Sequence, residues 1–128
     1  MAFIYIADDD EMLCDLVKGT LRTWGHTVGS VENGDDIITA LPIKKPDLLI
    51  LDCNMPGQSG IMVLRALRST MQFYRLPVIM LTALDSAADE AIARFAGAND
   101  YIRKPADLDL IAFRVDELLA QRARYKCQ

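Results

Sequence analysis

Cysteine and histidine are scarce in this sequence. Its 128 residues include three cysteines, Cys14, Cys53 and Cys127, and a single histidine, His26. An odd number of cysteines without a C-x-x-C pair argues against a disulfide framework and against a zinc site, so we expect reduced thiols. Because His26 has no cysteine or histidine neighbour at ligand spacing, we expect it to be structural and not a metal ligand.

Long apolar runs and an excess of positive charge are also missing. The apolar run nearest the N-terminus, residues 2–7, has no basic leader and is too short for a signal peptide or a transmembrane helix. Fourteen Lys and Arg residues against eighteen Asp and Glu residues give a net charge of -4, which offers no overall field to attract a nucleic-acid backbone. We therefore expect a cytoplasmic chain that has neither a membrane nor a nucleic acid as its partner.

The composition is that of a globular domain. Hydrophobic residues make up 52% of the chain and charged residues 25%, and the length is that of one domain. There is no internal repeat, low-complexity tract or linker. We predict one domain over residues 1–124, followed by a short polar tail at residues 125–128.

Five short apolar runs alternate with longer segments of helical periodicity. The runs cover residues 3–7, 27–31, 47–51, 78–82 and 100–103. This alternation predicts an α/β domain. The middle runs carry little polar alternation, as is typical of strands that are covered on both faces, so a parallel sheet is predicted.

In the helical segments, apolar residues recur every three to four positions, which predicts one apolar stripe on each helix. The stripe of the fourth helix comprises Ala88, Ala91, Ile92, Phe95 and Ala96. We expect Ser86 to start this helix and Gly97, which can adopt left-handed geometry, to end it. Pro42 is interpreted as a chain break, like the prolines at positions 46 and 77.

Polar residues stand at the exits of four predicted strands: Asp8 and Asp9, Asp52, Thr82, and Lys104. Because ligands of such folds bind beyond the carboxyl ends of the strands, we expect these side chains to converge. Crowded carboxylates repel one another, and Mg²⁺ would neutralise them while keeping waters for a phosphate ligand. Lys104 and Thr82 supply a positive charge and a hydroxyl group for phosphoryl oxygens. The pattern predicts a phosphoryl-transfer site.

Four motifs, in this order and spacing, carry a resemblance that covers essentially the whole chain. They are Ala7–Asp10, then Lys45–Asp52 followed by Met55–Gly57 and Gly60, then Pro77–Ala83, and finally Gly97–Tyr101 with Lys104–Pro105. Together they resemble the receiver domain of two-component response regulators. The resemblance implies a flavodoxin-like three-layer sandwich, in which a five-stranded parallel sheet of order 2-1-3-4-5 is covered by five helices.

The resemblance also implies the chemistry of the site. Asp52 would be the phosphoacceptor, which receives a phosphoryl group from a phosphohistidine of a sensor histidine kinase or a histidine phosphotransfer protein. Mg²⁺ would be held by Asp52, by Asp9 directly, by Asp8 through water and by the backbone carbonyl of Asn54. The chain would then act in phosphorelay signal transduction and would not be an enzyme beyond its self-catalysed phosphotransfer and autodephosphorylation.

The resemblance further implies how the signal is read. Thr82 and Lys104 would bind the phosphoryl oxygens, and Tyr101 would be an aromatic switch that turns inward as Thr82 moves, although such an aromatic residue is also common as simple packing. The Lys104–Pro105 peptide bond would be cis. A downstream effector protein would bind the face formed by the fourth helix, the fifth strand and the fifth helix. The chain would be a monomer or a phosphorylation-dependent dimer.

Two other functions are open from the sequence. An aspartyl-phosphate phosphatase of the haloacid dehalogenase type would also use a strand-end aspartate on free substrates. That class needs a second aspartate two residues later, where this chain has Asn54. The remaining hypothesis is a scaffold that has the receiver fold but is never phosphorylated. The complete set of site residues argues against this hypothesis.

Overall fold

The five predicted strands form one parallel sheet. The computed structural model describes residues 1–126, with side chains through residue 123, so Cys127 lies outside the described residues. The strands are β1 (Phe3–Ala7), β2 (Thr27–Val31), β3 (Leu48–Leu51), β4 (Val78–Thr82) and β5 (Asp100–Arg103). They lie in the order β2-β1-β3-β4-β5.

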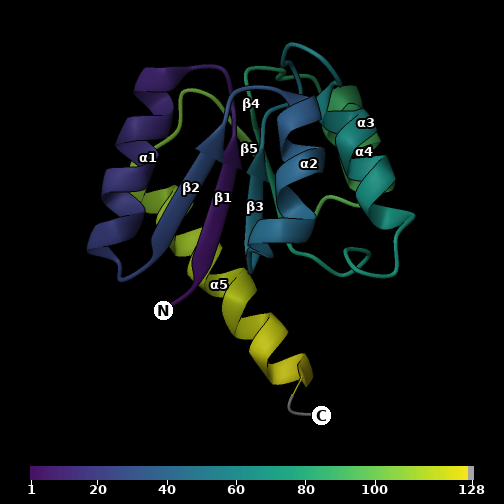
Figure 1. Cartoon of the computed structure of the whole chain (residues 1–128). Coiled ribbons are helices and arrows are strands. Elements are labelled where there is room, and N and C mark those ends of the chain that lie inside the picture. Colours follow the sequence, from purple (N-terminus) through teal and green to yellow (C-terminus); the bar gives the residue numbers. More distant parts are fainter. Residues whose placement is uncertain (127–128) are drawn as a thin grey trace.

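Helices cover both faces of this sheet. They are α1 (Glu11–Thr23), α2 (Gly34–Lys44), α3 (Gly60–Arg68), α4 (Ala87–Ala96) and α5 (Leu108–Lys126). Figure 1 shows α1 and α5 on one face and α2, α3 and α4 on the other. This three-layer arrangement and the strand order confirm the predicted flavodoxin-like fold.

The central strands are buried on both faces, which explains their continuous apolar sequence. Successive side chains of a strand point to opposite sides, so Leu49 and Leu51 pack with α2, α3 and α4, whereas Leu48 and Ile50 pack with α1 and α5. Cys14 and Cys53 are free, buried thiols, as expected. Both core layers are therefore built by the same short strands.

Side-chain caps fix where four helices begin at the carboxyl edge of the sheet. Each cap accepts a hydrogen bond from the backbone N–H three residues further on, and the caps are Asp10, Asn33, Ser59 and Ser86. Gly97 ends α4 with a φ of 118°, as predicted. The caps hold the loops that follow the strands, and these loops carry the site.

Two predicted boundaries were wrong. Pro42 lies inside α2, which continues to Lys44, because a proline near a helix end removes only its own N–H bond; the next turn still closes through Lys45 N–H and the Leu41 carbonyl, at 2.9 Å. The third strand begins one residue later than predicted. Asp47 instead accepts a hydrogen bond from the Phe3 N–H through its carboxylate, at 2.9 Å.

The apolar stripe of α4 does not face the sheet. Four of its five members are exposed to solvent: Ala88, Ala91, Ile92 and Phe95. The side of α4 next to β5 carries Glu90 and Arg94, which pair with β5, and Ala93 is the buried residue of this helix. Periodicity identified residues that share a face, but it did not indicate which way that face points.

Helix α5 is longer than expected and is linked to the sheet by His26. It continues through Lys126, so residues 125 and 126 are helical, and the predicted domain boundary at residue 124 stays a prediction. The His26 ring is buried; its Nδ1 accepts the Ala2 N–H at 3.1 Å and its Nε2 lies 2.6 Å from Asp116 Oδ1. His26 is structural, as predicted.

Within residues 1–126, no helix has the length and apolar character that crossing a membrane requires.

Candidate functional site

The strand exits bring the predicted carboxylates together at the carboxyl edge of the sheet. Asp8 and Asp9 follow β1, and Asp52 follows β3, which pairs with β1. One carboxylate oxygen from each of these three residues lies within 4.8 Å of the others. Asp8 and Asp52 are buried, whereas Asp9 is exposed. The pocket therefore concentrates negative charge where little water can screen it.

Lys104, which follows β5, reaches into this acidic pocket. Its Nζ donates to Asp8 Oδ2 at 2.7 Å and to Asp52 Oδ2 at 3.2 Å. Burial on its own would lower the pKa of Lys104, but the hydrogen bond to Asp8 and the charge of Asp52 raise the pKa overall. The Lys104–Pro105 peptide bond is cis, as the resemblance implied. Lys104 thus places one positive charge between two buried carboxylates.

The electrostatics of Asp52 reflect this excess of acid. Burial raises the pKa of Asp52, the neighbouring Asp8 raises it further, and Lys104 opposes both effects. One of its oxygens accepts the Asn54 N–H at 3.3 Å. Asp52 is therefore a carboxylate whose charge is costly until a further cation enters the pocket.

Gly60 explains part of the motif that follows Asp52. A Cβ at this position would lie 2.0 Å from the Asp52 backbone oxygen, which no side chain tolerates. The Gly60 N–H donates to the Cys53 carbonyl at 3.0 Å, so the start of α3 sits directly against the strand exit. Only glycine allows this close approach, which holds the backbone of Asp52 in place.

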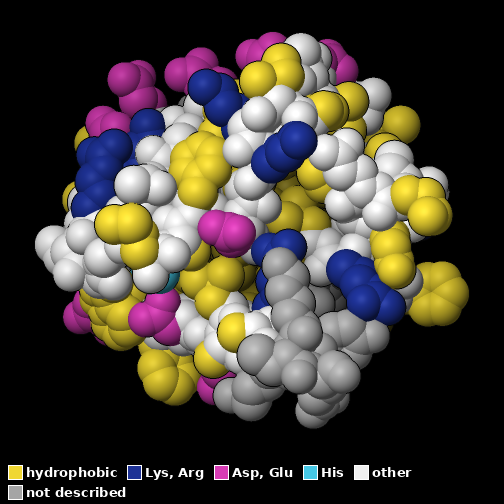
Figure 2. Space-filling model, turned by 60° about the horizontal axis from the view of Figure 1, so that its bottom comes forward, with side chains coloured by type: hydrophobic (Ala, Val, Ile, Leu, Met, Phe, Trp, Pro, Cys, Tyr) yellow, Lys and Arg dark blue, Asp and Glu magenta, His cyan; other side chains and the backbone are white. Residues whose placement is uncertain are grey.

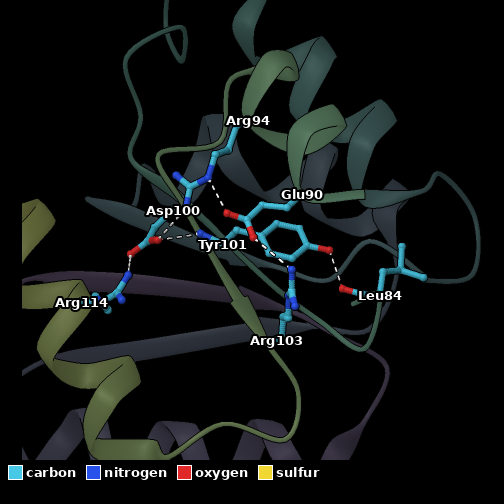
Figure 3. A network of polar contacts seen from close by, with 7 residues as sticks. All are labelled: Leu84, Glu90, Arg94, Asp100, Tyr101, Arg103 and Arg114. Atoms are coloured by element: carbon cyan, nitrogen blue, oxygen red, sulfur yellow. Dashed lines mark hydrogen bonds and ion pairs between the residues drawn. The ribbon is translucent and has the colours of Figure 1, made fainter. Parts of the chain in front are cut away.

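Thr82 and Tyr101 are both attached to Leu84, in the loop between β4 and α4. The Thr82 Oγ1 accepts the Leu84 N–H at 3.3 Å. The Tyr101 hydroxyl donates to the Leu84 carbonyl at 2.7 Å (Figure 3). The Tyr101 ring is buried, and this burial raises its pKa to about 12. In this structure Tyr101 already points inward, so the two residues that the sequence singled out as a switch share one anchor.

Sequence reasoning missed the ionic network beneath Tyr101. The Asp100 carboxylate accepts the Tyr101 N–H at 2.8 Å and pairs with Arg114 at 2.5 Å and with Arg94 at 3.4 Å (Figure 3). The Glu90 and Arg94 pair within α4, four residues apart, was predictable from spacing and is present at 2.9 Å. Asp100 lies in β5 and its partner Arg114 lies in α5, so no local pattern could have identified that ion pair.

The donor set of the pocket fits Mg²⁺. Receiver domains bind Mg²⁺ at an acidic pocket, and the ligand atoms here are carboxylate oxygens, which a hard divalent cation prefers. Two of the carboxylates are buried with a single ammonium between them, so the residues present carry more negative than positive charge. A bound cation would relieve this imbalance.

The fold and the site define a flavodoxin-like α/β domain with an acidic pocket at its carboxyl edge. The family model described as "Response regulator receiver domain" matches residues 4–116. The chain is therefore a member of the response regulator receiver domain family. This family gives no support to the phosphatase or scaffold alternatives, and its members are in general not true enzymes and interact with histidine kinases and effectors.

Individual relatives agree with this assignment. Response regulator protein PmrA of Pseudomonas aeruginosa is 42% identical over 115 residues, which cover 90% of this chain and 51% of the relative. The chain thus spans about half the length of that relative. A putative response regulator from Chloroflexus aurantiacus superposes with a TM-score of 0.89 and 30% identity, covering 93% of this chain and 98% of that chain. The receiver domain of Francisella response regulator 1452 also superposes with a TM-score of 0.89. It is 28% identical, and the match covers 95% of this chain and 99% of that chain.

Proposed function

We propose that this chain receives a phosphoryl group on Asp52 and acts as the receiver of a phosphorelay, with residues 1–124 as the functional domain. The observation that carries the proposal is the convergence of Asp8, Asp9 and Asp52 with Lys104 at one sheet edge. The donor would be a phosphohistidine of a sensor histidine kinase or a histidine phosphotransfer protein, met in the cytoplasm that the sequence predicts.

The chain's own residues account for the chemistry of this step. An Asp52 oxygen forms the new bond to phosphorus as the phosphorus–nitrogen bond of the phosphohistidine breaks, and the imidazole leaves with the electron pair. Lys104, already 3.2 Å from Asp52, would bind a phosphoryl oxygen, and the Thr82 hydroxyl would bind another. Asp8, Asp9, Asp52 and the Asn54 carbonyl would hold Mg²⁺, which when bound neutralises charge on the phosphoryl group.

An apolar hollow beside Lys104 offers a docking place for the phosphodonor. It has a volume of about 530 Å³ and lies between α1 and the loop before α5. Its lining residues include Leu13, Leu16, Pro105 and Leu108. A donor helix that packs an apolar face here would bring its phosphohistidine next to the acidic pocket.

The readout would pass through Leu84. A phosphoryl group that draws the Thr82 hydroxyl toward Asp52 would release the Leu84 N–H, while Tyr101 holds the Leu84 carbonyl. Such a change is a population shift that differential contacts of a few kcal/mol can drive. An effector protein would read it on the face formed by α4, β5 and α5.

Intact mass spectrometry tests the proposal directly. After incubation with Mg²⁺ and acetyl phosphate, the chain should gain one phosphoryl group, and the Asp52→Asn variant should gain none. Asp85→Asn is the matched control, because Asp85 is an exposed carboxylate in the loop after β4 and its loss should leave the uptake unchanged. An unmodified native chain, or a phosphoryl group that persists in Asp52→Asn, would overturn the proposal.

A further inference from the structure

The loop between β3 and α3, residues 52–59, carries two groups of the acidic pocket. Asp52 lies at its start, and the backbone carbonyl of Asn54 is a proposed ligand of Mg²⁺. The Asn54 N–H donates to Asp52 Oδ1 at 3.3 Å. A side-chain oxygen can be turned by rotation about the bonds of its own side chain, whereas the direction of a carbonyl is set by the planar peptide unit to which it belongs. The direction of the Asn54 carbonyl therefore depends on what holds the loop.

Hydrogen bonds hold this loop on both sides of Asn54. On one side, the Cys53 carbonyl accepts the N–H of Gly60, at the start of α3, at 3.0 Å. On the other side, the Pro56 carbonyl accepts the Gly34 N–H at 3.2 Å. Gly34 is the first residue of α2, which lies beside α3 on the same face of the sheet (Figure 1). The start of α2 therefore contributes one of the two bonds between which the Asn54 carbonyl lies.

Gly34 also lies directly against the backbone of the loop. A Cβ at this position would lie 2.1 Å from the Gln58 carbonyl oxygen and 2.8 Å from the carbonyl carbon. Because both atoms belong to the backbone, no side-chain rotation could relieve such a collision. Gly19 of α1 is the opposite case, since a Cβ there would meet nothing within 4 Å. The contact with the loop therefore explains why glycine, an unfavourable residue in a helix, stands at position 34.

The second residue of α2 contacts the same loop. Gly57 has a φ of 76°, and a Cβ there would lie 2.6 Å from Asp35 Oδ2, so the Asp35 carboxylate lies against this turn. The start of the helix is itself fixed, because Asn33 Oδ1 accepts the Asp36 N–H at 2.8 Å. The capped first turn of α2 is therefore a firm support for residues 56–58.

We propose that Gly34 is a positioning residue for the metal site. Its N–H holds the Pro56 carbonyl, and its lack of a side chain lets the first turn of α2 lie against residues 56–58, which fixes the direction of the Asn54 carbonyl. Gly34 acts through the loop and is not itself a ligand. This role rests on the proposed function, because it takes the acidic pocket as a site for Mg²⁺.

Titration of the isotope-labelled chain with MgCl₂, followed by NMR, tests this role. Gly34→Ala must displace either the loop or the first turn of α2. We therefore expect the dissociation constant for Mg²⁺ to rise about tenfold or more, as is typical when a group that orients a metal ligand is lost. Gly19→Ala is the matched control and should leave the constant unchanged. An unchanged constant in Gly34→Ala would refute the role.

A second control separates positioning from a general loss of stability. Leu41 is fully buried on α2, two turns beyond Gly34, and Leu41→Ala should lower the free energy of unfolding without reaching the loop. We expect folded Leu41→Ala to bind Mg²⁺ as tightly as the native chain does. If it loses as much affinity as Gly34→Ala, the loss comes from lower stability, and Gly34 has no positioning role.

Hydrogen exchange in the native chain tests the same coupling without any substitution. Because coupling is reciprocal, a loop contact that favours Mg²⁺ binding is itself favoured by bound Mg²⁺, so exchange of the Gly34 amide should slow severalfold at saturating MgCl₂. The Asp36 amide, which is bonded to Asn33 and not to the loop, should keep its rate. A native chain that does not bind Mg²⁺ would refute the proposed metal site together with this role. A native chain that binds Mg²⁺ while the Gly34 amide responds no more than the Asp36 amide would refute this role alone.

Discussion

The two edges of the sheet handle buried charge in different ways. At the carboxyl edge, Asp8 and Asp52 share the single ammonium of Lys104. At the amino edge, the half-buried Arg68 binds the Gly97 and Phe73 carbonyls, and the buried His26 ring contacts Asp116. Both edges satisfy their hydrogen bonds, since no buried side-chain nitrogen or oxygen among the described residues lacks a partner. They differ in charge balance.

Helix direction contributes to this difference. The helices begin at the carboxyl edge, where α1, α2 and α4 have acidic first turns, and end at the amino edge, where α1, α2, α3 and α4 have basic last turns. Figure 2 shows the amino edge, where Lys and Arg side chains lie between hydrophobic ones and most visible Asp and Glu side chains lie at the margin. Acidic first turns and basic last turns complement the helix dipoles. The amino edge thus contributes to stability, while the carboxyl edge keeps an electrostatic cost that a cation and a phosphoryl group can relieve.

The largest expected effect on stability is at the amino edge. Arg68→Ala removes four hydrogen bonds, to the Gly97 carbonyl twice and to the Phe73 carbonyl and Asn99 Oδ1 once each. Because the Gly97 and Phe73 carbonyls are partly buried and would lose their charged donor, we expect the free energy of unfolding to fall by about 2 to 4 kcal/mol, measured by urea denaturation.

Arg65→Ala is the control for this change. Arg65 lies one turn earlier on the same helix and is exposed, so its loss should cost less than about 0.5 kcal/mol. Equal losses in the two variants would mean that the amino edge is not a stabilising network. The contrast between the edges would then fail.

The next largest expected effect on the free energy of unfolding is at the carboxyl edge, where a substitution should stabilise the chain instead of destabilising it. Burial and Asp8 raise the pKa of Asp52 in the folded chain above its ordinary value of 3.8. Its contribution to stability is therefore greatest at low pH, when it is protonated, and is lost as the pH rises through the unfolded value toward the folded one. Asp52→Asn should be more stable than the native chain by about 0.5 to 2 kcal/mol at neutral pH.

Urea denaturation across pH checks this sign. The advantage of Asp52→Asn should grow as the pH rises from about 4 and should shrink when Mg²⁺ is added, because the cation stabilises the ionised native carboxylate. Asp85→Asn, at an exposed site, is the control and should change the free energy of unfolding by less than about 0.5 kcal/mol. If the native chain is the more stable one at neutral pH without Mg²⁺, the carboxyl edge is not strained.

Much of this contrast could be predicted from the sequence. The bounds of four strands were correct, because short apolar runs ended at sharp polar residues, and the same polar residues marked the pocket. What the sequence could not provide was contact between distant elements. Arg68 meets Asn99, 31 positions away, and Asp100 collects partners from α4 and α5, so nothing in local spacing pointed to either. For α4, the period was recognised but the direction of its apolar face was not.

The smallest expected effect on the free energy of unfolding concerns the hydrogen bond between the Tyr101 side chain of β5 and the Leu84 carbonyl. Tyr101→Phe removes the hydroxyl that donates to the Leu84 carbonyl at 2.7 Å and keeps the buried ring. We expect the free energy of unfolding to fall by about 0.5 to 1.5 kcal/mol, against little change in Tyr74→Phe, whose ring is exposed. Burial raises the pKa of Tyr101 to about 12, so the phenol stays protonated in the folded chain while the unfolded phenol titrates near 10. The difference between native chain and variant should therefore hold constant below about pH 9 and shrink above it, because the native chain loses stability as the unfolded phenol ionises between about 10 and 12. A difference that varies between pH 5 and pH 8 would show that Tyr101 acts through another titrating group, and that the bond to Leu84 is not what anchors the switch.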